Sequence, residues 1–242
     1  NGYRTMDASY MESIWWVFKQ LWDKDLIYEG HKILPYCPRC ATPLSNFEAN
    51  QGYADVQDPS VTLRFQSCDE PDLYFLAWTT TPWTLPSNLA LAVNAEVDYV
   101  VVADGPNRYV LAAGRLDTYY RDEAPEIVAR LKGSDLVGKR YCPLFPYFSA
   151  LADDGAFRIV AADFVSTENG TGIVHMAPGF GEDDSVVCRA EGIPMVCPLD
   201  SECCFTEDVP DYAGRAAKDA DRDIIRRLKS EGKLIHQSTC QH

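Results

Sequence analysis

The stretch LYFLAWTTTPWTLPSN (residues 73–88) joins an apolar run to three threonines and a Pro-Trp turn. Residues 73–78 predict a buried strand, because aromatic and aliphatic residues fit a packed strand better than a loop. Thr79, Thr80 and Thr81 suit the end of that strand, since threonine is β-branched and the following proline cannot continue the ladder. The same threonines also suit the mouth of a pocket, where they would present three hydroxyl groups. Both interpretations stay open on these residues alone.

Further short β-type runs follow along the chain, separated by Gly, Pro and Asp/Asn clusters. The segment ADGPNR (residues 103–108) predicts a hairpin turn between two of them. Strands at this spacing favour a barrel or sandwich over alternating βαβ units. The predicted strands cover residues 31–36, 61–65, 73–78, 89–93, 99–102, 109–112 and 157–161.

Helical patterns lie near both ends of the chain and at two places between. The first begins with Ser9 as N-cap and Glu12 three residues on, as in a capping box, and is expected to end near Lys24. Residues 216–231 carry the clearest amphipathic pattern, with an apolar face opposite a basic one. The predicted helices cover residues 9–24, 113–120, 183–191 and 216–231.

Composition and charge narrow the class of protein. The chain has 242 residues, of which 46% are hydrophobic and 24% charged, as in an ordinary globular protein. No run approaches the roughly 18 apolar residues of a membrane helix. The net charge is −14, with the acidic excess mostly in residues 51–200. Such a surface repels phosphate backbones, which argues against a stand-alone nucleic-acid binder.

The N-terminal sequence and the cysteines indicate whether the chain is part of a longer protein and in which cellular compartment it lies. The opening NGYRTMDASY has neither an initiator Met nor a secretory signal, which suggests a piece of a longer protein. Nine cysteines at irregular spacing indicate reduced thiols and a cytosolic, cytoplasmic location.

The segment CPRC places Cys37 and Cys40 at the spacing of half a tetrahedral zinc site. No second Cys-x-x-Cys follows, and the adjacent Cys203 and Cys204 have poor geometry for one ion. A redox role would need a thioredoxin-like βαβ context, which is not evident. The expectation is no cofactor and no metal, with zinc at Cys37 and Cys40 as an alternative.

The segment GTGIVHMAPGFGEDD (residues 170–184) combines a glycine turn, a short apolar strand and three acids. The acids at its end suit the first turn of a helix, where carboxylates favour the positive end of the dipole. Taken alone, His175 is better explained as a core histidine with satisfied hydrogen bonds than as a site residue. The glycine spacing is not a dinucleotide fingerprint, and no nucleophile elbow or phosphate loop is present. Water is therefore the expected attacking group in any hydrolysis.

Together these segments resemble one family. WTTTPWTLPSNLALAVN (residues 78–94) and GTGIVHMAPGFGEDD resemble the two signature segments of the editing domain inserted in class I aminoacyl-tRNA synthetases. Residues 10–48 are similar to the entry into that insertion in isoleucyl-tRNA synthetases. Valine and leucine enzymes typically carry arginine and an acidic residue where Thr81 and Trp83 stand here. The sequence of residues 46–61 resembles that of the eukaryotic enzymes.

The resemblance implies an α+β fold with a compact β-barrel core and peripheral helices. It implies that residues 1–242 are a single editing domain excised from a larger synthetase, with residues 1–50 and 201–242 as flanking helical and connecting segments. The implied activity is hydrolysis of valine wrongly attached to the isoleucine tRNA, with valyl-adenylate as a further substrate. The implied partners are the 3′ CCA end of that tRNA and the rest of the synthetase, without a membrane.

Site roles follow from the same resemblance, position by position. Asp184 matches the carboxylate that holds the substrate's α-ammonium group, and His175 matches a residue that obstructs the larger isoleucine side chain. The threonine-rich strand aligns the ester carbonyl and a water molecule, with no general base assigned. The implied catalytic residues are Thr79, Thr80, Thr81 and Asp184, and the implied substrate-binding residues are Trp78, Thr84, Asn88, His175, Phe180 and Asp184.

Two alternatives belong to other classes. The chain would be a non-catalytic, zinc-knuckle-type binding or appended domain if it kept the fold without the chemistry. It would be a cysteine-dependent hydrolase if one of its thiols were the nucleophile.

Overall fold

The structure is a computed structural model that describes residue 2 and residues 4–51, 53–121 and 124–241. It divides into two units, residues 1–32 and residues 33–242, which are described separately. The first unit contains helix α1 (Ala8–Trp22). Asp7 occupies its N-cap position, without a side-chain capping bond. The prediction of a helix here is confirmed, but the prediction of Ser9 as its N-cap is wrong, because Ser9 already lies in the first turn.

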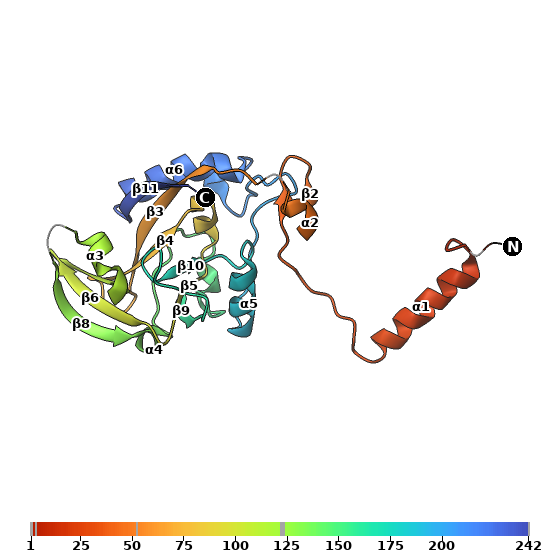
Figure 1. The fold of residues 1–242 in the computed structure, drawn as a ribbon, viewed down its shortest axis with the longest axis horizontal. Coiled ribbons are helices and arrows are strands. Elements are labelled where there is room, and N and C mark those ends of the chain that lie inside the picture. Colours follow the sequence, from red (N-terminus) through yellow and green to blue (C-terminus); the bar gives the residue numbers. More distant parts are fainter. Residues whose placement is uncertain (1, 3, 52, 122–123, 242) are drawn as a thin grey trace. The chain divides into compact units, whose positions relative to one another are not determined.

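The second unit is built on a nine-stranded mixed sheet that curves into a half-barrel (Figure 1). Its main path runs β8-β6-β7-β4-β10-β5-β9, and β3 and β11 extend it from β4. A separate two-stranded sheet pairs β1 (Tyr36–Cys37) with β2 (Thr42–Pro43). The strands of the large sheet are β3 (Gln57–Gln66), β4 (Leu73–Thr79), β5 (Ala90–Val93), β6 (Asp98–Asp104), β7 (Asn107–Ala112), β8 (Glu126–Lys132), β9 (Arg158–Ala161), β10 (Val174–Met176) and β11 (Leu234–Gln241).

Strand β4 is the point at which this sheet divides. One edge of β4 pairs antiparallel with β3 along almost its whole length. The other edge pairs in parallel with β7 over residues 73–75, and with β10 at Trp78. Strand β7 continues to β6 and β8, whereas β10 continues to β5 and β9. The two limbs therefore separate just before Thr79, where β4 ends.

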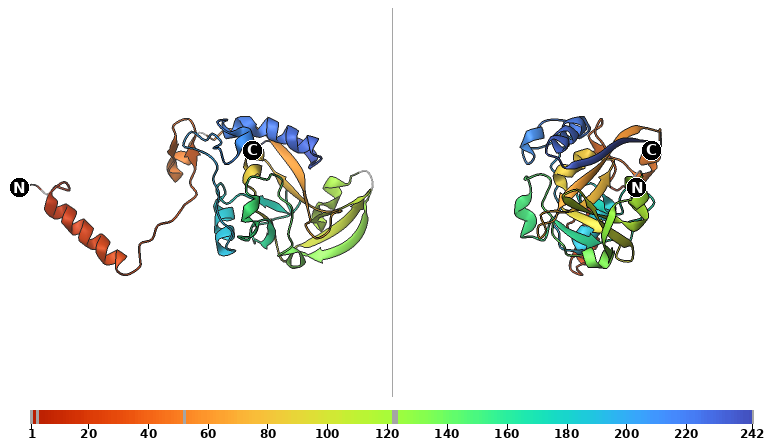
Figure 2. Two further views of the ribbon diagram at one scale, coloured as in Figure 1. Left: turned by 180° about the vertical axis from the view of Figure 1, so that it is seen from behind. Right: turned by 90° about the vertical axis from the view of Figure 1, so that its left-hand side faces the viewer.

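Helices and 3-10 turns surround the sheet. Helix α6 packs on β11 and on the 3-10 helix η1, and Figures 1 and 2 both show α6 beside β11. Helix α5 follows β10 and its loop. The bounds are α2 (Asn46–Ala49), η1 (Pro82–Ser87), η2 (Ala113–Arg115), α3 (Leu116–Tyr119), α4 (Gly133–Leu136), η3 (Ser149–Ala152), α5 (Glu182–Ala190), η4 (Pro210–Tyr212) and α6 (Ala217–Ser230).

The core lies on both faces of the central strands, which explains why β4 is apolar along its length. Phe75 and Ala77 face the main cluster, whereas Leu76 faces a second cluster between the sheet and α3. Side chains alternate across a strand, so a strand covered on both sides needs apolar residues at every position. Glycine is also required in the turn at residues 170–172 for a steric reason. Gly172 has φ +77°, and a Cβ there would clash with the Cβ of Ala112.

Most of the predicted elements are present. The strands predicted between residues 61 and 112 and at 157–161 correspond to β3–β7 and β9, and Gly105 makes the predicted hairpin turn with φ +60°. The predicted strand at 31–36 is wrong, because only Tyr36 of that run pairs, in β1. Strands β8 and β11 were not predicted. Residues 201–242, expected as a flanking segment, contribute α6 and β11, and β11 pairs with β3.

Membrane-spanning segments were also sought. Within the described residues, no helix has the length and apolar character needed to cross a bilayer.

Candidate functional site

The two signature segments meet where the sheet divides. Val174 of β10 pairs with Trp78 of β4, and the Leu89 N–H donates to the Met176 carbonyl over 3.0 Å. The rings of Trp83 and Phe180 pack edge to face, with their centroids 5.0 Å apart. Residues 78–89 and 174–180 therefore form one continuous region of the protein.

The three threonines at the end of β4 differ in their contacts. The buried Thr79 hydroxyl accepts the Thr81 N–H at 3.1 Å and lies 3.1 Å from the Thr81 hydroxyl. Thr80 is half-buried, and its hydroxyl has no hydrogen-bond partner among the described residues. Thr79 and Thr81 thus stabilise the strand end, and Thr80 retains a hydroxyl that a ligand or water can use.

His175 is held by hydrogen bonds at both ring nitrogens. The Asn88 amide nitrogen lies 2.9 Å from Nδ1, and the Thr84 hydroxyl lies 2.8 Å from Nε2. The amide donates, so Nδ1 accepts and the proton is on Nε2, which donates to Thr84 Oγ1. The Thr84 hydroxyl in turn donates to the Thr81 carbonyl at 2.8 Å, and the Tyr141 hydroxyl donates to Asn88 Oδ1 at 2.7 Å.

This network makes His175 a neutral residue with no nitrogen free for proton transfer. Burial lowers its pKa to about 4, so the imidazole is uncharged at neutral pH. The sequence predicted His175, Thr84 and Asn88 as site residues, and the structure brings all three together. The sequence did not point to Tyr141, because no motif links that residue to Asn88.

Asp184 lies in the first turn of α5 and folds back over the preceding loop. Its Oδ2 accepts the Ala177 N–H at 2.8 Å, and a Cβ on Gly181 would lie 2.8 Å from its Cγ. Burial raises the pKa of Asp184, and the nearby Asp183 adds to this, whereas the bond from Ala177 opposes it. Glu182 and Asp183 are exposed at the helix start and fit the helix-dipole interpretation. Asp184 differs, because one of its oxygens fixes the loop and Oδ1 has no hydrogen bond within the described chain.

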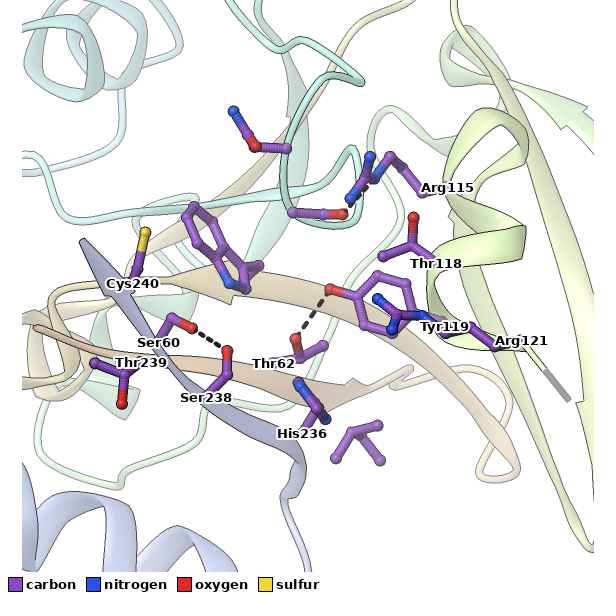
Figure 3. Close-up of a pocket in the computed structure, with 14 residues that line it drawn as sticks. Ser60, Thr62, Arg115, Thr118, Tyr119, Arg121, His236, Ser238, Thr239 and Cys240 are labelled. Carbon is purple, nitrogen blue, oxygen red and sulfur yellow. Dashed lines mark hydrogen bonds between the residues drawn. The ribbon is translucent and has the colours of Figure 1, made fainter. Parts of the chain in front are cut away.

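A cavity of about 550 Å³ opens beside Trp78, and Figure 3 shows its lining. Among the predicted site residues, only Trp78 lines it. The η2–α3 segment contributes Arg115, Tyr119 and the following Arg121, and β11 contributes His236. Its serines and threonines are Ser60, Thr62, Thr118, Ser238 and Thr239.

The cavity is ordered by its own hydrogen bonds and adjoins the threonines. The Thr62 and Tyr119 hydroxyls lie 3.0 Å apart, and Arg115 donates to the Gly170 carbonyl at 2.8 Å. Thr62 pairs with Trp78 across β3 and β4, so both side chains are on one face of the sheet. Thr80 follows two residues after Trp78, in the bend just beyond the end of β4. Cationic, aromatic and hydroxyl groups together suit a phosphorylated nucleoside in a protein that is otherwise acidic.

Asp221 is a buried carboxylate that the sequence did not single out. It is 6% exposed on α6, close to the Trp83 backbone of η1, and neither of its oxygens has a well-formed hydrogen bond. The nearest cation is Lys218, whose Nζ is 3.9 Å away and forms a closer ion pair with Asp58. Burial raises the pKa of Asp221 to about 6.

We expect Asp221→Asn to raise the free energy of unfolding by about 1–2 kcal/mol at pH 7–8, because it removes a poorly compensated buried charge. The folded-state pKa lies above the ordinary value of 3.8, so wild-type stability is lost as the pH rises from about 4 through about 6. The gain should therefore vanish near pH 4. Urea denaturation across this pH range measures it, with the exposed Asp219→Asn on the same helix as control. An equal gain at pH 4 and pH 8 would contradict the charge explanation.

The Cys-x-x-Cys pair lies at the β1–β2 turn, where the Cys40 N–H donates to the Cys37 sulfur at 3.4 Å. This backbone donor lowers the pKa of Cys37. Over the ranges that the structure describes, no three His, Cys, Asp or Glu side chains are grouped as metal ligands. The expectation of no metal, with zinc at Cys37 and Cys40 as the alternative, stays a prediction.

Sequence comparison places the chain beside isoleucine–tRNA ligases. It is 53% identical to the ligase of Bdellovibrio bacteriovorus over 246 residues, which cover 100% of this chain and 23% of that protein. It is 50% identical to the ligase of Treponema denticola over 276 residues, covering 100% and 25% respectively. The chain thus spans about a quarter of the length of these relatives. Both organisms are bacteria, so the expectation of a eukaryote-like chain finds no support here.

Structural comparison finds editing domains of leucine enzymes. The structure described as GlLeuRS-CP1 matches with a TM-score of 0.58 at 14% identity, over 74% of this chain and 99% of that one. The leucyl-tRNA synthetase editing domain of P. knowlesi matches with a TM-score of 0.58 at 12% identity, over 78% and 99%. These matches confirm the predicted fold class. The family model of tRNA synthetases class I (I, L, M and V) matches residues 1–199, and the chain therefore belongs to that family.

Proposed function

We propose that this chain is a hydrolytic editing domain, which removes valine wrongly esterified to the isoleucine tRNA. A single observation carries the proposal: the pairing of Val174 with Trp78 joins the loop held by Asp184 to the threonines that end β4. A hydrophobic pocket distinguishes isoleucine from valine by one methylene group only, a known limit for synthetases and not a result of this structure. A second site that excludes the larger side chain overcomes that limit.

Different residues anchor the ammonium group, limit the size of the amino-acid side chain and polarise the ester carbonyl. The free oxygen of Asp184 accepts the α-ammonium group of the valyl ester in a charge-assisted bond, which fixes the ester's orientation. The neutral His175 ring, held by Thr84 and Asn88, is a rigid wall against the amino-acid side chain. The Thr80 hydroxyl polarises the ester carbonyl or positions the attacking water.

The reaction needs no covalent enzyme intermediate. Water adds its oxygen to the ester carbonyl, the ribose oxygen leaves with a proton, and valine and the tRNA are released. His175 is not the base, because both of its nitrogens are engaged and burial keeps its pKa near 4. A ribose hydroxyl of the tRNA is the group closest to the leaving oxygen, and it is the proton carrier in this proposal.

The cavity beside Trp78 supports a nucleic-acid substrate. Arg115, Arg121 and His236 line it in a protein whose net charge is −14. The terminal nucleotide of the CCA end fits this chemistry, with its ester directed toward Thr80. The same proposal makes the rest of a longer synthetase a partner, places the protein in the cytosol and includes valyl-adenylate as a further substrate.

The test is deacylation of Val-tRNA and Ile-tRNA by the purified chain, with the spontaneous rates as reference. We expect hydrolysis of Val-tRNA and none of Ile-tRNA. Thr80→Val removes the hydroxyl without changing the shape and should lower the rate by about 100-fold, whereas Thr80→Ser should retain most of it. Stoichiometric zinc in a chain that deacylates neither substrate would favour the binding-module alternative.

A further inference from the structure

Two cysteines outside the proposed site lie within contact of each other. The Sγ atoms of Cys68 and Cys142 are 3.5 Å apart, and both residues are exposed in the 242-residue chain. The two residues are 74 positions apart in sequence, so the fold and not the local chain brings them together.

Backbone pairing holds the two thiols in place. The Cys68 N–H donates to the Arg140 carbonyl at 3.0 Å, and the Cys142 N–H donates to the Gln66 carbonyl at 2.8 Å. These bonds flank an antiparallel bridge between Ser67 and Tyr141. A disulfide has its sulfurs about 2.05 Å apart, so the two side chains must turn toward each other to form one.

We propose that Cys68 and Cys142 form a reversible disulfide by exchange with a low-molecular-weight disulfide such as oxidised glutathione. The proposal is independent of the hydrolytic function. Seven further cysteines are present in the chain. Cys37 and Cys40 are a second close pair, in a tight turn and not across two paired segments, and Cys203 lies near Cys37 and Cys197.

The exchange has a defined direction. Partial desolvation, together with the neighbouring Cys142 thiol, raises the pKa of Cys68 to about 11, which disfavours Cys68 as the first nucleophile and leaves the first attack to Cys142. The Cys142 sulfur attacks one sulfur of oxidised glutathione and releases a first glutathione thiolate. The Cys68 thiol then gives up its proton, and its sulfur attacks Cys142 and releases the second glutathione. The chain loses two electrons and two protons, and both appear in two molecules of reduced glutathione.

The disulfide would clamp a segment that supports the proposed site. Tyr141 precedes Cys142 and pairs with Ser67, which precedes Cys68. The Tyr141 hydroxyl donates to Asn88, which donates to His175. The Tyr141 ring packs edge to face on Phe65 and on Phe157. Oxidation therefore joins covalently the two backbone segments that meet at Tyr141.

The experiment treats the 242-residue chain with oxidised glutathione, blocks remaining thiols by alkylation and maps the peptides by mass spectrometry. We expect a cross-linked peptide joining Cys68 and Cys142, lighter by about 2 Da than the two thiol peptides together. Dithiothreitol should reverse it, and the oxidised chain should melt at a higher temperature than the reduced chain.

Single variants separate the steps. Cys68→Ser removes the resolving thiol and should trap glutathione on Cys142, with no change in melting temperature. Cys40→Ser removes the other close pair and should leave the cross-link unchanged. The proposal is overturned if wild-type Cys142 accumulates glutathione without the cross-link, or if Cys68 and Cys142 are both alkylated in full while Cys37 and Cys40 oxidise.

Discussion

Asp184→Asn is expected to lower hydrolysis of Val-tRNA by about 100-fold in a chain that keeps its fold. Asparagine retains an oxygen that accepts the Ala177 N–H, so the loop over residues 177–181 stays in place. It removes the charge that holds the α-ammonium group. Because burial raises the pKa of Asp184, ionisation of this group is a cost to folding at neutral pH, and the neutral amide does not destabilise the chain.

Two comparisons identify the lost interaction. Asp184→Ala removes both the charge and the acceptor of the Ala177 N–H, so it should lose activity and also about 1 kcal/mol of stability. A substrate whose amino group is acetylated offers no ammonium, and wild type and Asp184→Asn should cleave it equally slowly. Normal hydrolysis of Val-tRNA by Asp184→Asn would show that the anchor lies elsewhere.

His175→Ala is expected to let the chain hydrolyse Ile-tRNA, at least about 10-fold above the wild-type rate. The substitution removes the ring that stands between Thr84 and Asn88 and opens the wall to a longer side chain. It also leaves two buried partners without their hydrogen bonds and creates a cavity, which should cost about 3 kcal/mol of stability. Deacylation of both charged tRNAs, together with urea denaturation, measures the two effects.

Tyr141→Phe is the matched control for this experiment. It removes the bond to Asn88 Oδ1, 2.7 Å long in the wild type, and leaves the imidazole in place. Stability should fall by about 1–2 kcal/mol, with isoleucine still rejected. If Tyr141→Phe relaxes specificity as much as His175→Ala does, general loosening of the core and not the histidine wall is the cause.

The parts of the fold that were predictable from sequence are those with two-sided burial or turn chemistry. Strand β4 is apolar at nearly every position because both of its faces are covered. Strand β11, LIHQSTCQ, has no such pattern, because it is held by backbone pairing along β3 and is mostly exposed. The run HKILPY at residues 31–36 was predicted as a strand, but only Tyr36 finds a pairing partner, and Pro35 lacks the N–H that a ladder needs.

The candidate site was likewise predictable only in part. Motif resemblance pointed to both signature segments, and the structure joins them at Val174 and Trp78. The resemblance could not show that both ring nitrogens of His175 are hydrogen-bonded, because that depends on Tyr141 and Asn88 meeting across the core. One wall of the cavity beside Trp78 is β11, a strand with no sequence signal, so the cavity itself was not predictable.

The most direct measurement is a crystal structure of the chain with a non-hydrolysable valyl-adenosine analogue, in which an amide replaces the ester. The account predicts the ammonium group within about 3 Å of Asp184 Oδ1, the isopropyl group against the His175 ring and the adenosine beside Trp78. An analogue bound with its ammonium group away from Asp184, while that carboxylate contacts only the Ala177 N–H, would contradict it.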